Sequence, residues 1–210
     1  MNQKATESRT RRFIILSFCL VWACSALTAQ QRGWGVEASG SYLTLPRSIL
    51  ENVVENQYTK TISLEGYTLS GRLCRIKDNG APSYSFGYVQ TRLSLRGTAP
   101  MNYATLNGYA VLRGAIITKY FNFVERRRGS FGLLLGGGIA RVNAGSMETF
   151  TPPNRPPYYE TDQWRDKPLP LLEFGLQGDV RVSNRFSVFF LGGFQHVALG
   201  GGAGIRYRFR

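Results

Sequence analysis

The sequence predicts an all-β protein, an eight-stranded antiparallel up-and-down barrel that spans a membrane. Three features favour this class. The chain begins with a segment typical of exported proteins. Apolar and polar residues then alternate with a period of two. Short connections and long connections alternate between these segments. After residue 29 no stretch reaches the roughly 18 consecutive apolar residues that a membrane helix needs, so strands are left as the spanning elements.

Residues 1–29 have the composition of a cleaved export signal. Lys4 and three arginines stand against a single acid in residues 1–12, an apolar run follows, and small residues close it. This order is typical of a secretory signal peptide. We expect cleavage after Ala29, with Ala26 as the alternative, and a mature barrel domain of residues 30–210. A lipid-anchored start at Cys24 is the rival interpretation.

The expected mature chain is strongly basic. Without residues 1–29, 26 Lys+Arg and 13 Asp+Glu become 22 and 12, a net charge of about +10. Cys74 is then the remaining cysteine, which excludes an intramolecular disulfide and a cysteine zinc site. By itself the positive charge suggests nucleic acid, anionic lipid or lipopolysaccharide phosphate as partners, or only arginines buried in an interior. With the strand pattern described below, the expected partner is outer-membrane lipid or lipopolysaccharide. We expect no nucleic-acid partner, no metal and no cofactor.

The period-two alternation predicts eight strands. It is sharpest over 172–182, where apolar residues alternate with Glu173, Gly175, Gln177, Asp179 and Arg181. The strands are expected at 34–42, 64–76, 83–96, 108–123, 130–143, 172–182, 186–196 and 201–209.

The connections predict how these strands are joined. Short polar turns are expected at 77–80, 125–129 and 183–184. Longer links lie at 46–61, 97–107 and 146–169, with a tight one near 197–200. Alternating short and long links are typical of an up-and-down meander.

The two faces of the strands predict which side meets lipid. Aliphatic residues with aromatic residues near the strand ends form one face, as a bilayer requires, and the ring must close because lipid cannot satisfy a free sheet edge. The expected aromatic girdles are Trp34, Tyr120, Phe131, Phe186, Tyr207 and Phe209 at one end, and Tyr42, Tyr67 and Phe194 at the other.

The opposite face carries isolated charges among glycine and serine. The charges expected in the lumen are Glu37, Arg72, Arg113, Lys119, Glu173, Asp179, Arg181, Arg206 and Arg208. Because an unpaired buried charge is costly, we expect them to form a plug of ion pairs. A narrow channel is the alternative.

The segment "KYFNFVERRRGSFGLLLGGGIARV" (119–142) and the closing "GIRYRF" resemble the small outer-membrane β-barrel family of OmpA/OmpX type, over essentially all of 33–209. The resemblance implies a Gram-negative outer membrane with both mature termini in the periplasm. It also implies that the barrel-assembly machinery recognises the terminal strand through Ile205, Tyr207 and Phe209. Arg210 extends one residue beyond the family's usual aromatic end.

Three glycine-containing segments invite a phosphate-binding or a catalytic interpretation. The glycine-rich runs at 132–140 and 200–204 lack the strand–turn–helix context of a phosphate loop and are interpreted as strands. The segment "GGFQHVALGGG" (192–202) is similar to the last hairpin of the lipid A deacylase family, but Ala198 stands where that family has its serine nucleophile. His196 is therefore interpreted as an interfacial aromatic residue at a strand end.

Two further segments are candidates for binding. The segment 146–169 combines five prolines with Tyr158, Tyr159 and Trp164, residue types that dominate recognition surfaces. The alternative is a loop that is merely soluble and exposed. The basic turn at 125–128 is interpreted as solvated, with contacts to lipid phosphate or cell-wall polymer as the alternative.

The function predicted from these features is a structural, non-enzymatic one: a membrane-anchored scaffold that presents surface loops to a ligand the sequence does not identify. A porin-like narrow pore is the first alternative. A lipid-modifying enzyme of the lipid A deacylase type is the second, weakened by the missing nucleophile.

Overall fold

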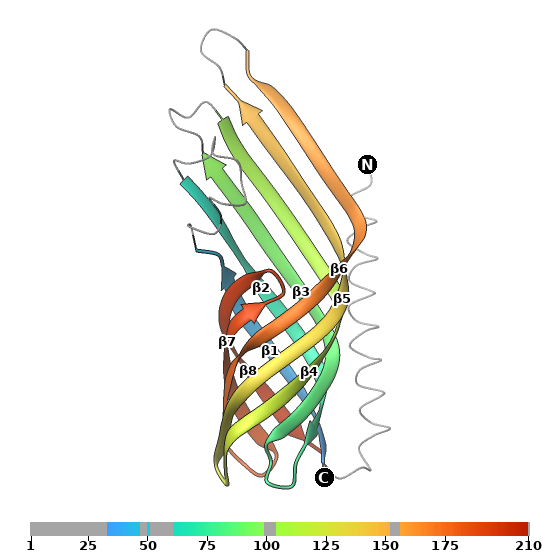
Figure 1. The fold of residues 1–210 in the computed structure, drawn as a ribbon, viewed down its shortest axis with the longest axis vertical. Coiled ribbons are helices and arrows are strands. Elements are labelled where there is room, and N and C mark those ends of the chain that lie inside the picture. The colour runs from blue at the N-terminus through green and yellow to red at the C-terminus, as the bar shows by residue number, and fades with distance from the viewer. Residues whose placement is uncertain (1–32, 47–49, 51–60, 99–103, 152–155, 210) are drawn as a thin grey trace.

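The computed structural model describes residues 33–46, 50, 61–98, 104–151 and 156–209. These residues form a closed antiparallel ring in which each strand pairs with the next and the last with the first, so the predicted fold class is confirmed (Figure 1). The expected signal peptide and its cleavage at Ala29 lie outside the described residues. The strands are β1 Trp34–Thr44, β2 Thr61–Ile76, β3 Pro82–Thr98, β4 Ala104–Arg126, β5 Gly129–Phe150, β6 Tyr158–Arg181, β7 Phe186–Gln195 and β8 Ala198–Arg208.

The ring is strongly staggered. Following directly paired residues once around it from Trp34 leads back to Thr44 on the same strand, a displacement of ten residues. A stagger of this kind tilts the strands by about 40° to the barrel axis. With eight strands, the interior is just wide enough to be filled by side chains. Among the described residues, no helix is long and apolar enough to cross a membrane.

The wall of the barrel differs in height around the ring. Strands β5 and β6 have 22 and 24 residues, whereas β7 and β8 have 10 and 11. Figure 1 shows β5 and β6 rising far beyond the low β7–β8 hairpin. We call the end with the β2–β3, β4–β5 and β6–β7 turns the short-turn end, and the opposite end the long-strand end.

The tall β5–β6 hairpin corrects one expectation. A loop was expected over 146–169, but β5 continues to Phe150 and β6 begins at Tyr158. The ladder is sustained by β-forming residues, with Thr149 paired to Tyr159. Pro168 lies beside a register shift, where proline is tolerated because the ladder is already interrupted.

The outer face of the ring is apolar. Leu176 on β6 is 48% exposed, and its neighbours on the same face, Phe174 and Leu172, are also exposed. Soluble monomers rarely expose apolar surface on this scale. Tyr42 pairs with Tyr67 toward the long-strand end. Ring contacts at the short-turn end join Trp34 to Tyr84, Phe186 to Tyr207, and Tyr207 to Phe209.

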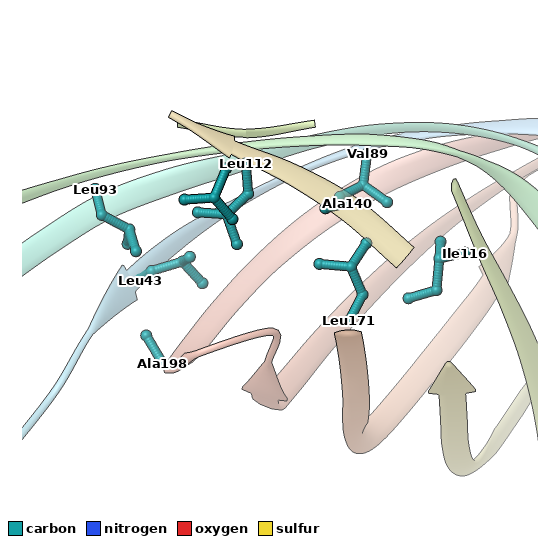
Figure 2. Packing of buried hydrophobic residues seen from close by; sticks show 9 residues of the cluster. Leu43, Val89, Leu93, Leu112, Ile116, Ala140, Leu171 and Ala198 are labelled. Carbon is teal, nitrogen blue, oxygen red and sulfur yellow. The ribbon is translucent and has the colours of Figure 1, made fainter. Parts of the chain in front are cut away.

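The interior has two layers. Toward the short-turn end it holds a network of charged side chains. Toward the long-strand end it holds an apolar cluster that includes Leu43 and Ala198, which lie at the long-strand ends of β1 and β8 (Figure 2). The other buried members of the cluster are Val89, Leu93, Leu112, Ile116, Ala140, Val142 and Leu171.

Candidate functional site

The centre of the charged layer is Arg206 on β8, which is 1% exposed. Its Nε and Nη2 donate to Oε2 of Glu37 on β1 at 3.1 and 3.0 Å, and its Nη1 donates to Asp179 on β6. The guanidinium carbon also lies 4.9 Å from the ring centre of Phe189. The Tyr120 hydroxyl on β4 donates to the other Glu37 oxygen at 2.8 Å. This group ties four strands together through the lumen.

A second buried pair crosses the full width of the barrel. Arg72 on β2 and Glu173 on β6 form two hydrogen bonds of 2.9 Å, one from each terminal nitrogen. The Thr118 hydroxyl donates to the same carboxylate at 2.9 Å. Because β2 and β6 lie on opposite sides of an eight-strand ring, this bidentate pair spans the lumen.

Five of the charges expected in the lumen thus meet there: Glu37, Arg72, Glu173, Asp179 and Arg206. Arg181 and Arg208, also on inward-facing positions, lie instead at the short-turn mouth. Each of these carboxylates accepts a hydrogen bond from an arginine, whereas Arg72 Nε and Asp179 Oδ1 are buried without a hydrogen-bond partner.

Two of the expected lumen charges point the other way. Arg113 and Lys119 on β4 lie on the outer face, because they alternate with the buried Leu112, Ile116 and Tyr120. The expectation was wrong for β4 because both of its faces are apolar, so its alternation does not say which is inside. Tyr120, expected in the outer girdle, is for the same reason an interior residue.

The outward position of Arg113 creates an unusual pair. Arg113 lies directly opposite Arg141 on β5, and its Nε is buried without a hydrogen-bond partner. Like charges directly opposed on one face of a sheet are destabilising. Arg92 on β3 also lies on this outer face, over the ring of Tyr67. A cationic strip therefore borders the apolar belt toward the long-strand end.

The β7–β8 turn does not have the character expected of it. His196, predicted to be interfacial, is a buried turn residue in the left-handed region, with φ of 64° and neither ring nitrogen hydrogen-bonded. Ala198, at the position of the deacylase serine, is fully buried in the apolar cluster. The backbone N–H of His196 donates to the carbonyl of Leu172, which seats the turn against β6.

The candidate binding aromatics do not form one surface. Tyr159 and Trp164 are 63% and 57% exposed, but the alternation of β6 places them on opposite faces of the hairpin. Trp164 pairs with Ala144, which packs against the interior cluster, so it shares the concave inner face. The side chain of Tyr158 lies outside the described part of the chain.

A cavity of about 810 Å³ opens on that concave face, and Val197 of the β7–β8 turn is part of its lining. Its walls are mostly apolar, and Trp164 and Lys167 lie among them. Both reach this face because a register shift between Val142 and Ala144 takes up two residues of β6, Arg165 and Asp166. The apolar lining residues are Leu93, Ala110, Leu112, Val142, Ala144, Leu169 and Val197.

The C-terminal strand closes the ring through the residues predicted for it. Ile205 and Tyr207 face outward, and Tyr207 packs on Phe209 with ring centres 5.8 Å apart. The Phe209 N–H donates to the carbonyl of Trp34 at 2.8 Å, beyond the last strand pair. Arg210 lies outside the described residues. Among the described residues, no group of three or more His, Cys, Asp or Glu side chains could hold a metal.

A closed ring with an apolar outer belt, aromatic ends and a charged, side-chain-filled interior defines the class: an eight-stranded up-and-down transmembrane β-barrel of the outer-membrane type.

No family model matches the sequence, and no curated protein matches it. Among solved structures, the chain is similar to Ail, the attachment invasion locus protein of Yersinia pestis. The two are 13% identical, 85% of this chain and 100% of that chain are covered, and the TM-score is 0.40. It is also similar to neisserial surface protein A, at 13% identity, with 84% and 97% coverage and a TM-score of 0.35. At this identity the likeness concerns the fold alone.

Proposed function

We propose that this protein is a non-catalytic scaffold of the bacterial outer membrane that holds the β5–β6 hairpin at the cell surface for interaction. The proposal rests mainly on the length of that hairpin, whose strands are about twice as long as β7 and β8. A strand of about 9–11 residues suffices to span. The additional length of β5 and β6 therefore stands outside the bilayer, and Tyr159 is exposed on its outer face.

This proposal requires the short-turn end, and with it the end of β8, to lie in the periplasm. Orientation is testable by cysteine labelling, since Cys74 is buried and is the one cysteine in residues 30–210. A membrane-impermeant maleimide added to whole cells should label Thr161→Cys on the hairpin. It should leave Asn184→Cys, in the β6–β7 turn, unlabelled until the cells are lysed. The reverse pattern would contradict the orientation.

The interior network supports a scaffold over a pore. Arg72, Glu173 and Arg206 are buried and joined across the lumen, so ions would have to break paired charges to pass. We expect no stable conductance in planar bilayers. A lipid-modifying enzyme is disfavoured by the buried Ala198 at the nucleophile position. Unchanged lipid A mass spectra from expressing cells, relative to cells without the protein, are the expected result.

Lipopolysaccharide is the proposed lipid partner. Arg113 and Arg141 face each other on the outer surface at the edge of the apolar belt, where lipid phosphates lie. A phosphate between them would convert a repulsive cross-strand pair into two charge-assisted contacts. The assembly machinery is the proposed partner of the terminal strand, on the resemblance described above.

A second candidate function, binding of a single hydrocarbon chain, is favoured by the cavity of about 810 Å³. Its size lies within the usual range for ligand sites, roughly 300–1,000 Å³. Its walls are apolar and Lys167 lies at the lining, which suits an acyl chain with an anionic head. In a Trp34→Phe background, a brominated fatty acid should quench Trp164 fluorescence. Leu112→Gln should weaken the quenching, and the lipid-facing Leu172→Gln should not.

A further inference from the structure

The short-turn end encloses a second cavity, of about 470 Å³, which the proposed surface function does not use. It is formed where the β2–β3, β4–β5 and β6–β7 turns converge on the end of β8. Arginines from three separate segments line it. They are Arg127 and Arg128 from the β4–β5 turn, Arg181 and Arg185 from the ends of the β6–β7 turn, and Arg206 and Arg208 from β8.

The charges of this cavity are not balanced within it. Arg206 is already paired with Glu37 and Asp179. The other five arginines share the lining with one acid, Asp78. Like charges gathered in a concave site focus a positive potential that draws in anions.

Contacts between the turns hold these arginines in place without neutralising them. Arg181 donates from Nη1 to the backbone carbonyl of Arg127 at 2.7 Å. The backbone N–H of Arg208 donates to the carbonyl of Arg185 at 2.8 Å. The Nε and Nη2 atoms of Arg181 are buried and have no hydrogen-bond partner. Two donors of this guanidinium are thus buried at the cavity without a hydrogen-bond partner.

Gly80 on the β2–β3 turn lies directly against the guanidinium of Arg181. Its φ of +83° is in the left-handed region, and a Cβ there would lie 2.6 Å from the guanidinium carbon of Arg181. Glycine therefore allows the turn to close over the side chain. The arginine cavity is accordingly a packed feature of the short-turn end, formed by its backbone as well as its side chains.

We propose that this cavity binds a compact, multiply charged oxyanion, such as a phosphate or pyrophosphate group. The guanidinium fork bonds phosphate oxygens bidentately, and a phosphate group concentrates about two negative charges in a small volume. The Asn184 side chain at the rim adds an uncharged amide donor. The binding itself is independent of the surface function; its periplasmic location rests on the orientation proposed above.

The experiment is calorimetric titration of the folded protein, in zwitterionic detergent at low salt, with pyrophosphate and with inorganic phosphate. We expect saturable binding that is tighter for pyrophosphate and weakens steeply with salt. Arg181→Gln and the double variant Arg127→Gln/Arg128→Gln should each lose about tenfold or more in affinity, equivalent to about 1.4 kcal/mol. Arg181→Lys should lose bidentate contact and fall between these and the wild type.

The matched control is Arg126→Gln, which removes the same charge from the same hairpin but lies outside the cavity lining. It should change affinity less than about twofold. An equal loss of affinity for Arg126→Gln and Arg181→Gln would show that binding depends only on the overall positive charge of this end, and would overturn the proposal. Absence of saturable binding by either anion at low salt would overturn it as well. Heat-modifiable gel mobility verifies that each variant is folded before titration.

A further arm distinguishes the source of the phosphate. The protein is placed in nanodiscs of zwitterionic lipid or of lipid with phosphatidylglycerol, and the pyrophosphate titration is repeated. If anionic lipid competes with pyrophosphate and Arg181→Gln removes that competition, the natural ligand is a lipid head group. If pyrophosphate binds equally in both nanodiscs, the ligand is a soluble phosphate compound. Either result requires the arginine cavity to bind the oxyanion.

Discussion

Arg72 and Glu173, which are 101 positions apart in the sequence, face each other across the barrel and are joined by two hydrogen bonds of 2.9 Å. Removing one partner leaves a buried charge uncompensated, at a cost of about 3–5 kcal/mol. We therefore expect Glu173→Leu to lower the free energy of unfolding by this amount. The double variant Arg72→Met/Glu173→Leu should recover most of the loss, because apolar pairs of similar volume replace buried ion pairs well. Urea unfolding in bilayers, followed by tryptophan fluorescence, measures the free energy of unfolding of both variants. An equal loss of stability in the single and the double variant would contradict a direct interaction between Arg72 and Glu173.

The second prediction concerns depth in the membrane. Leu176 faces outward midway between Leu172 and Val180 on β6. An arginine near the bilayer midplane costs about 2–4 kcal/mol, falling to about 0–1 near the interfaces. Leu176→Arg should therefore destabilise the folded barrel far more than Val182→Arg, which lies outward just beyond β6 at the short-turn end. The same unfolding measurement tests this, and equal costs would show that the apolar belt does not meet lipid as described.

The third prediction concerns the opposed arginines Arg113 and Arg141. In a phosphate-free detergent, Arg113→Gln should raise stability by a few tenths of a kcal/mol, since it relieves a like-charge cross-strand pair. In bilayers that contain lipopolysaccharide, the same variant should lower stability, because a phosphate-binding donor is lost. Thermal unfolding in both media checks the reversal of sign. Arg126→Gln, at the short-turn end of β4, is the control and should show no reversal.

The fourth prediction is a pH dependence at the short-turn end. Lys77 donates to one oxygen of Glu125, and Asn79 donates to the other. The hydrogen bond from Lys77 is the largest cause that holds the pKa of Glu125 below its ordinary value, and the bond from Asn79 adds to it. Because the pKa of Glu125 is lower in the folded state, its ionised form stabilises the folded protein at pH values above the unfolded-state pKa of about 4.3. This stabilisation disappears as the pH falls through the folded-state pKa.

Glu125→Gln should therefore lower stability at pH 7 by less than about 1 kcal/mol, because solvent screens this exposed pair. The difference from the wild type should shrink as the pH falls below about 4. Denaturant midpoints at pH 7 and pH 3 measure it. Glu160→Gln on the β5–β6 hairpin is the matched control. A difference that grows toward acid would contradict the assignment.

The fifth prediction concerns assembly. Phe209 packs on Tyr207 and hydrogen-bonds to Trp34, joining the last strand to the first. Phe209→Asp should abolish heat-modifiable mobility of the protein in membrane fractions, because it places a charge at the aromatic end that closes the ring. Deleting Arg210 should leave assembly unchanged. If the Arg210 deletion fails to assemble while Phe209→Asp succeeds, the terminal residues do not act as a closing strand.

The fold class and the orientation of several strands could be predicted from the residue pattern alone. On β1, β6 and β8, charges occupy one face and larger apolar residues the other. Glu37, Glu173, Asp179 and Arg206 therefore had to point inward once a lipid-facing outer surface was inferred. The same reasoning identified the terminal aromatic residues as outward. For such strands the alternation shows which face points inward and which points outward, because only one face is apolar enough to meet lipid.

Other features depend on how the strands pair in the folded barrel. On β4 both faces are apolar, so the period fixed an alternation without saying which face is inside; pairing with β3 and β5 placed Tyr120 within and Arg113 outside. The prolines of 146–169 suggested a loop, yet cross-strand pairing carried β5 and β6 through most of it. The partners of the buried charges, and the meeting of arginines from three segments at the short-turn mouth, depend on the ten-residue stagger with which the ring closes. That stagger arises from all eight registers together, and no single stretch of sequence contains it.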